Sequence, residues 1–185
     1  MKSVNKSVLL IALGHQIEGH IQQAVVHFQN MDEVTLCQPS PSGGWSIAQC
    51  LDHLNSYGRY YLPRLNQGLA SRQHKPTTDR LESSWLGAFL VRLMDPKTGT
   101  KKFRAVKRHQ PANDLPAHQI VAEFIEQQEQ LLDVLKQVEN ANVDGIQIAL
   151  SIASWLHLPI GNVLQFLVIH TERHIRQANR NLPSV

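Results

Sequence analysis

Apolar residues recur at intervals of three and four along several stretches of this sequence, a spacing that is typical of helices with one buried face. The first stretch runs from about Asn5 to Gln29. Its predicted buried stripe consists of Leu10, Leu13, Ile17, Ile21, Val25 and Phe28. His15, His20 and His27 fall mostly off this stripe, so we expect them at exposed or boundary positions.

The second predicted helix has a clear starting signal. Ser46 is a good N-cap, Gln49 stands three residues later at the capping-box position, and Trp45 precedes the cap. A loop from about Thr35 to Gly44, with two prolines and two glycines, leads into this start. The apolar stripe continues beyond the cap, and Pro63 predicts a kink or an end of the helix.

The middle of the chain carries weaker signals. Leu81 to Met94 is predicted as a short helix, and a long irregular loop follows as far as Pro116. A third long helix is expected from about Ala117 to Val138. Its water-facing side is predicted to carry Glu123, Glu126, Gln127, Gln130 and Lys136. Residues Ile146 to Leu158 alternate in a way that favours extended structure over a helix.

The last predicted helix combines an apolar stripe with two side chains that can bind metal. It is expected to start near Asn162, whose side chain can cap it, and to continue to about Arg180. His170 and His174 stand four residues apart, so their imidazoles lie one turn apart on the same apolar face. A buried imidazole needs a partner. That partner is either a metal ion shared by both rings or a carbonyl or hydroxyl group for each ring.

His53 is the natural third member of such a group. It lies at the edge of the apolar stripe of the second helix, away from the charged side that carries Asp52 and Arg59. If the second helix faces the last one, three imidazoles can meet at one point. The alternative is a boundary histidine that binds water. The long loop before Pro116 can lie over the site as a lid, and His109 is its only further candidate ligand.

Composition places the chain among ordinary globular proteins. Its 185 residues fit one domain, 1–185, and 18 Lys and Arg against 15 Asp and Glu leave a margin too thin to imply nucleic acid. A local basic cluster is expected to be a solvated loop, with phosphate binding as the alternative. The cluster consists of Lys97, Lys101, Lys102, Arg104, Lys107 and Arg108. Two cysteines fit a reducing compartment, and no apolar run reaches the length of a membrane span, so we expect a cytoplasmic protein.

The order of these motifs resembles a known family. Gly44, Trp45 and Ser46 lead into a helix with Leu51, His53 and Leu54, and a distant His170 and His174 are followed by Gln177. This combination, from roughly Ser40 to Arg180, resembles the DinB/YfiT-like superfamily. The resemblance implies an all-α fold, a four-helix bundle with long connecting loops that is frequently dimeric. It also implies a divalent metal ion bound by His53, His170 and His174, all of which this sequence retains.

Such a site predicts metal-dependent chemistry. Three neutral imidazoles leave positions open on zinc, nickel or another divalent ion, where a water or a thiol is activated. Two reaction classes follow, namely hydrolysis and transfer of a low-molecular-weight thiol to an electrophile, so a small-molecule partner is expected. Tyr57, Glu172 and Arg173 are candidates for proton transfer or electrostatic assistance. The alternative is a metal-stabilised bundle that acts in a stress response by binding a partner. DNA binding is poorly supported, because no recognition-helix pattern accompanies the basic residues.

Overall fold

The computed structural model describes residues 2–40, 43–71, 78–98 and 104–182, and this part of the chain is mostly helical. The α-helices are α1 (Lys6–Gln23), α2 (Glu33–Cys37), α3 (Ile47–Ala70), α4 (Trp85–Met94), α5 (Ala117–Asn140) and α6 (Ile160–Asn179). A π-helical turn, η1 (Ala24–Phe28), continues α1, and a 3-10 turn, η2 (Lys107–His109), precedes α5. The strands are β1 (Lys2–Asn5), β2 (Arg80–Ser83), β3 (Gln147–Leu150) and β4 (Ala153–Pro159).

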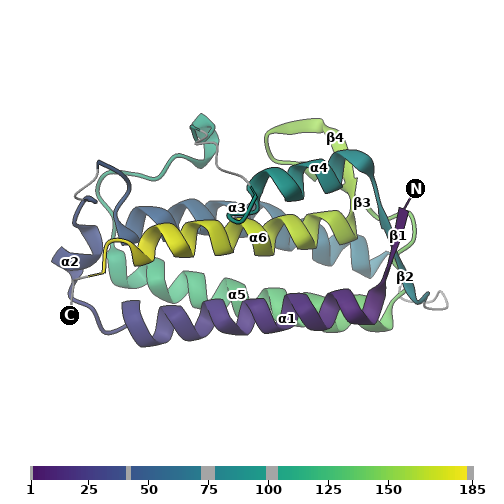
Figure 1. Cartoon of the computed structure of the whole chain (residues 1–185), viewed down its shortest axis with the longest axis horizontal. Helices are drawn as coiled ribbons and strands as arrows, with labels where there is room; N and C mark the ends of the chain where they lie inside the picture. The colour runs from purple at the N-terminus through teal and green to yellow at the C-terminus, as the bar shows by residue number, and fades with distance from the viewer. Residues whose placement is uncertain (1, 41–42, 72–77, 99–103, 183–185) are drawn as a thin grey trace.

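The four long helices α1, α3, α5 and α6 lie side by side (Figure 1). α1 and α3 each pack against both α5 and α6, while α4 lies against α6. Two small antiparallel sheets, β1 with β2 and β3 with β4, lie at the end of the molecule where α6 begins. The fold is therefore mostly helical rather than all-α throughout. The extended structure that alternation predicted between Ile146 and Leu158 is confirmed by β3 and β4.

The start of α3 is the element that the sequence predicts best. The Ser46 hydroxyl accepts a hydrogen bond from the backbone N–H of Gln49 at 3.1 Å, and the Gln49 side chain accepts one from the Ser46 N–H at 3.1 Å. Both bonds of a capping box are therefore present. The helix does not end at Pro63 but continues to Ala70. Leu62 and Leu65, buried on either side of Pro63, hold this part of the helix against the core.

The predicted exposure of His20 is wrong. The buried stripe of α1 and η1 keeps to intervals of three and four past Ile17, and these lead to His20 and Ala24, which are 2% and 0% exposed. Val25, predicted as buried, is 40% exposed. Nε2 of His20 lies 3.0 Å from Oε2 of Glu172 on α6, so the polar ring has a partner inside the core. The buried position thus belongs to a histidine, whereas hydrophobicity alone had predicted the apolar residue next to it in the sequence.

Gln127 and Asn162 are also buried, and neither has the role that the sequence predicted. Gln127 was predicted to face water, but its side-chain amide donates to the backbone oxygen of Asn55 on α3 at 3.3 Å. Asn162 is not the N-cap of α6, because the helix already begins at Ile160. The Asn162 side-chain oxygen instead accepts a hydrogen bond from the N–H of Ser84 at 2.8 Å, which joins the β2–α4 connection to α6. In both cases the amide replaces water with a backbone partner.

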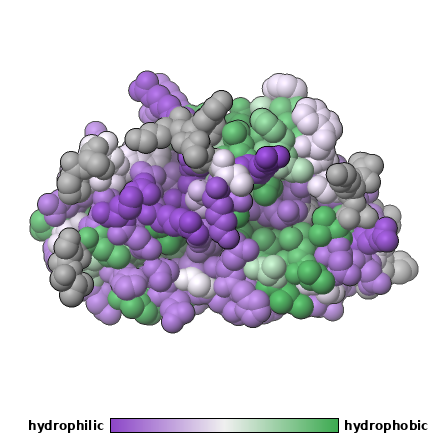
Figure 2. Space-filling view, in the orientation of Figure 1, coloured by the Kyte–Doolittle hydropathy of each residue, from purple (hydrophilic) through white to green (hydrophobic). Residues whose placement is uncertain are grey.

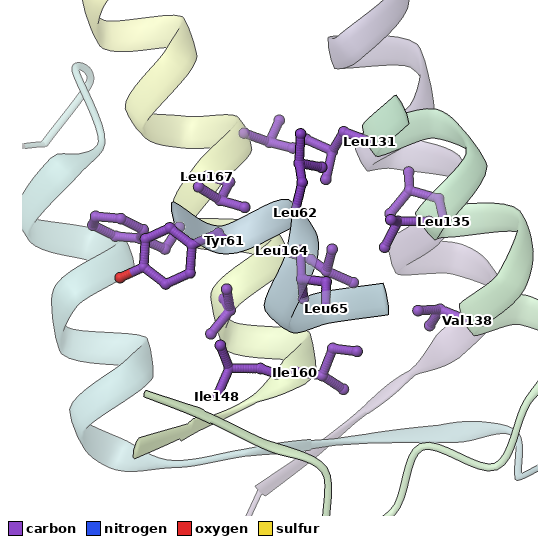
Figure 3. Close-up of a cluster of buried hydrophobic side chains, with 14 of the residues drawn as sticks. Tyr61, Leu62, Leu65, Leu131, Leu135, Val138, Ile148, Ile160, Leu164 and Leu167 are labelled. Atoms are coloured by element: carbon purple, nitrogen blue, oxygen red, sulfur yellow. The ribbon is translucent and has the colours of Figure 1, made fainter. Parts of the chain in front are cut away.

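The main hydrophobic core lies between α1, α3, α5, α6 and the β3–β4 sheet. Figure 3 shows a part of it, in which Leu62 and Leu65 of α3 meet Leu131 and Leu135 of α5 and Leu164 of α6. A second cluster surrounds Phe28, Leu36 and Phe124. Packing of α3 against α6 fixes the relative position of these two helices along their length. This arrangement carries the candidate site.

The surface carries several exposed apolar side chains. Trp85 and Phe89 on α4 and Trp155 on β4 are 81%, 55% and 76% exposed. Figure 2 shows hydrophobic surface over α4 and the β3–β4 sheet, next to a hydrophilic band over α6. None of the described helices is long and apolar enough to cross a membrane. Cys37 and Cys50 are both free thiols, as expected, and His118 at the start of α5 is exposed.

Candidate metal centre

The structure brings together His53 of α3 and His170 and His174 of α6, as predicted. Their exposed fractions are 3%, 4% and 9%, so all three imidazoles leave water on folding. One ring nitrogen from each lies within 4.8 Å of one from each of the others. In the described part of the chain, no fourth histidine, cysteine or carboxylate belongs to this group. The ring centroids of His53 and His174 are 4.6 Å apart.

The spacing of the nitrogens fits a shared ion. Nε2 of His53 and Nε2 of His170 lie 3.3 Å apart. Two nitrogens bound tetrahedrally at about 2.0–2.1 Å from zinc would be about 3.3–3.4 Å apart. The donor set is therefore compatible in chemistry with a divalent metal ion, and the His53–His170 pair is also compatible in distance.

Hydrogen bonds outside the group orient two of the rings. Nδ1 of His53 lies 2.6 Å from the backbone oxygen of His109, and Nδ1 of His174 lies 3.1 Å from Oε1 of Gln177. Both oxygens can only accept, so each Nδ1 carries the proton and each Nε2 keeps its lone pair. Such partners are typical of histidines that bind metal through the other nitrogen. The Nε2 atoms of His53 and His174 therefore keep lone pairs that could bind a metal ion.

His170 has a different environment. Its Nδ1 atom is buried and makes no hydrogen bond to the described residues, and the same is true of Oε1 of Gln128 on α5. Both residues line a cavity of about 20 Å³ between α3, α5 and α6. That volume is sufficient for one water molecule, which can accept a bond from Nδ1–H and donate one to the amide oxygen. With its proton on Nδ1, His170 keeps the lone pair of Nε2, which faces the other two histidines.

Burial keeps the three imidazoles neutral. Loss of hydration lowers the pKa of His53 and His170 below the ordinary value and lowers the pKa of His174 to about 3. Proximity of the rings adds to the effect, since each would repel a second charge. A neutral imidazole is the form that binds metal, so protons compete weakly for these ligands.

Aromatic rings enclose the group. Trp45, just before the N-cap of α3, lies with its ring centroid 4.8 Å from that of His53 and 5.7 Å from that of His174. Tyr57 lies on the other side, 4.5 Å from the ring of His170. Burial raises the pKa of Tyr57 well above its ordinary value, so the phenol stays protonated. The sequence predicted Trp45 as the residue preceding the helix cap and as part of the family motif, but gave it no role at the site.

The three histidines open onto a cleft of about 1110 Å³ between α6, α4 and the loop before η2. Residues that line it include Trp45, Tyr57, Leu90, Ser151, Phe166 and Arg173. Arg104 of the predicted basic cluster also lines it, whereas Lys101 and Lys102 lie outside the described residues. The cleft is large enough for a small organic molecule.

The remaining candidates from the sequence take other roles. His109, the additional candidate ligand, is buried, but its Nδ1 atom bonds the Ser56 hydroxyl at 2.8 Å and its backbone oxygen serves His53. Glu172 binds His20 and Arg176, which lower the pKa of its carboxyl to about 2, and it does not line the cleft. Sequence reasoning missed the role of Gln177, although its position three residues after His174 was a usable signal.

The geometry defines a class: a mostly helical protein with three neutral histidines, from two packed helices, grouped at the wall of a cleft. A family model described as the DinB superfamily matches residues 16–178. The match covers most of the sequence, so the chain belongs to the DinB superfamily, and the resemblance found in its motifs is confirmed. Searches of curated proteins and of solved structures gave no significant match.

Proposed function

We propose that this protein binds a divalent metal ion through His53, His170 and His174 within a four-helix bundle of α1, α3, α5 and α6. We further propose that it is a metal-dependent enzyme, which either transfers a low-molecular-weight thiol to an electrophile or catalyses hydrolysis. The convergence of the three neutral imidazoles at the wall of a cleft is the observation that carries the proposal. Zinc and nickel suit a set of imidazole ligands.

The arrangement favours a catalytic over a purely structural centre. A structural site is closed by a fourth side chain and is dry, whereas a catalytic site keeps a position open to substrate. In the part of the chain that the structure describes, no fourth ligand joins the group, and all three histidines line the cleft. A small molecule in the cleft therefore reaches the face of the group that the protein leaves uncovered.

The surrounding residues have definable roles in such a reaction. A divalent ion with three imidazole ligands lowers the pKa of a water or thiol bound to it. His109, through its backbone oxygen, and Gln177 hold His53 and His174 in the tautomer that presents Nε2. Trp45 and Tyr57 shield the rings from water, and the protonated Tyr57 phenol can donate but not accept a proton. No carboxylate lines the described part of the cleft, so a substrate group or a solvent molecule has to receive the proton.

The alternative is a metal-stabilised protein that binds a partner without catalysis. The exposed aromatic residues Trp85, Phe89 and Trp155 support a protein contact, either with another protein or in a homodimer. This alternative predicts bound metal without turnover. The enzyme proposal predicts turnover that is lost with the metal.

Metal analysis of the purified protein tests the proposal, with His174→Ala as the variant and His157→Ala as the control, because His157 is exposed on β4. We expect about one ion per wild-type or control chain, and a severe loss in His174→Ala with an unchanged helical circular dichroism spectrum. Zinc-loaded and nickel-loaded protein are then assayed for thiol conjugation and for ester hydrolysis. Wild-type metal content in His174→Ala would refute the assigned ligands, and bound metal with no turnover would favour the alternative.

A further inference from the structure

The charge of the cleft is strongly one-sided. Arg104, Arg173, Arg176 and Arg180 line it, and no aspartate or glutamate does so in the described part of the chain. The whole protein has a formal charge of only +3. The excess of guanidinium groups at this one cleft is therefore a local feature and does not reflect an unusually basic chain.

Three of these arginines come from the helix that carries two of the histidines. Arg173 and Arg176 of α6 and Arg180, its C-cap residue, recur at intervals of three and four, which places them along one face. Arg176 is partly neutralised by Glu172. Arg180 is exposed, and its guanidinium donates to the backbone oxygen of Arg176 and to no carboxylate among the residues that the structure describes. The positive charges of Arg173 and Arg180 also lower the pKa of His174, after burial and the neighbouring His53, so both lie close enough to act on the site.

The opposite wall of the cleft is apolar. Leu90, Leu93 and Met94 of α4 line it, together with Ile152 between β3 and β4. Figure 2 shows the same contrast on the surface, with hydrophobic residues over α4 and hydrophilic residues over the C-terminal half of α6. A ligand that fills the cleft thus meets apolar side chains on one side and guanidinium groups on the other.

We propose that the cleft binds a small organic anion, with its carboxylate or phosphate on the arginines of α6 and its apolar part against α4. As the substrate class of the centre, this inference rests on the proposed function, because the three histidines line the same cleft. Guanidinium groups bind carboxylate and phosphate through paired, charge-assisted hydrogen bonds. The volume of the cleft, about 1110 Å³, suits a small molecule rather than a nucleic acid backbone.

The test uses two fluorescent probes of similar size, the anionic 8-anilinonaphthalene-1-sulfonate and the uncharged N-phenyl-1-naphthylamine. We expect wild-type protein to bind the anionic probe more tightly, with one site and with an affinity that falls at high salt. In Arg173→Gln/Arg180→Gln, affinity for the anion should fall about tenfold or more, while affinity for the neutral probe stays unchanged. Arg92→Gln, on the exposed side of α4, is the matched control and should bind both probes like wild type.

Charge-reversed and charge-retaining variants make the result decisive. Arg173→Glu/Arg180→Glu should bind the anion more weakly than the glutamine variant, and Arg173→Lys/Arg180→Lys should retain most of the affinity. Displacement by decanoate, decyl phosphate and decanol then distinguishes carboxylate from phosphate, with the alcohol as the uncharged reference. Equal losses for both probes, or no loss for either, would overturn the proposal.

Failure of this inference can be distinguished from failure of the proposed function. Metal content is measured on every arginine variant, and both probes are titrated into His174→Ala. We expect the arginine variants to keep their metal and His174→Ala to keep its preference for the anion. A wild-type protein that carries no metal but still selects the anion refutes the metalloenzyme. A metal-loaded protein with no such selection refutes the anionic ligand.

Discussion

Replacement of Gln177 by leucine tests whether a hydrogen bond outside the histidine group tunes metal affinity. The Gln177 side-chain oxygen accepts from Nδ1 of His174 at 3.1 Å and so fixes the tautomer that presents Nε2. Leucine keeps most of the volume but removes the acceptor. Nδ1–H of His174 then lacks its partner, and the ring is no longer held in the orientation for binding.

The two effects of this substitution differ in size. Loss of one neutral hydrogen bond should lower the free energy of unfolding of the metal-free protein by about 0.5–1.5 kcal/mol. Loss of the orienting partner of a metal ligand typically costs about 10–100-fold in metal affinity, or about 1.4–2.7 kcal/mol. We therefore expect Gln177→Leu to reduce zinc affinity more than it reduces the stability of the metal-free fold.

Competition for zinc with a chromophoric chelator measures the affinity, and urea denaturation of the metal-free protein measures the stability. Gln165→Leu is the matched control, because Gln165 also lies on α6 but bonds a backbone oxygen of its own helix and does not line the cleft. Gln177→Glu should bind zinc at least as tightly as wild type, since a carboxylate makes the imidazole a better donor. Wild-type affinity in Gln177→Leu would show that this contact does not orient a metal ligand.

Two further predictions concern pH and packing. Burial lowers the pKa of four histidines, namely His53, His109, His170 and His174, and the values for His109 and His174 fall to about 4 and 3. Between these values and about 6.5, the unfolded chain therefore binds more protons than the folded one. The free energy of unfolding of the metal-free protein should therefore fall from pH 7 to pH 4.5 in urea titrations, and constant stability over this range would contradict neutral buried histidines. In Gly58→Ala the new methyl group would lie 1.8 Å from the Gln127 side-chain oxygen, so Gln127 must move and lose its bond to Asn55, which should cost about 1–3 kcal/mol in the same urea assay. Gly19→Ala, with nothing within 4 Å, should instead stabilise α1 by about 0.5–1 kcal/mol, and equal effects of the two substitutions would refute this packing.

The parts of the site that the sequence predicts are those set by local spacing. His170 and His174 share a face because they are four residues apart, and the capping box at Ser46 fixes the phase of α3 and so the direction of His53. The family resemblance supplied the pairing of α3 with α6, which no local pattern contains. Spacing also predicted the long helices, and alternation predicted the β3–β4 sheet.

The rest depends on contacts between distant residues. His20 is buried because Glu172, 152 residues away, provides a partner for its ring. The contribution of His109 to the site is a backbone oxygen, and any residue type offers one, so the sequence holds no signal for it. The β1–β2 sheet is four residues long and pairs Lys2 with Ser83, so it lacks the length and alternation that periodicity needs. Of the arginines of the cleft, the sequence singled out only Arg173 and, within the basic cluster, Arg104, because their common surface exists only after α4 and α6 pack together.

The bond between His53 and the backbone of His109 ties one of the three clustered histidines to the segment that precedes α5. This segment belongs to neither of the helices that carry the three histidines, yet its displacement would release the His53 ring. An ion held by the three rings would in turn restrain the segment, because an immobilised His53 ring keeps its hydrogen bond to the backbone oxygen of His109. Amide hydrogen exchange around η2 should therefore slow when zinc is bound. Occupancy of the histidine group could then be measured from the protection of a backbone segment that contributes no side chain to the group.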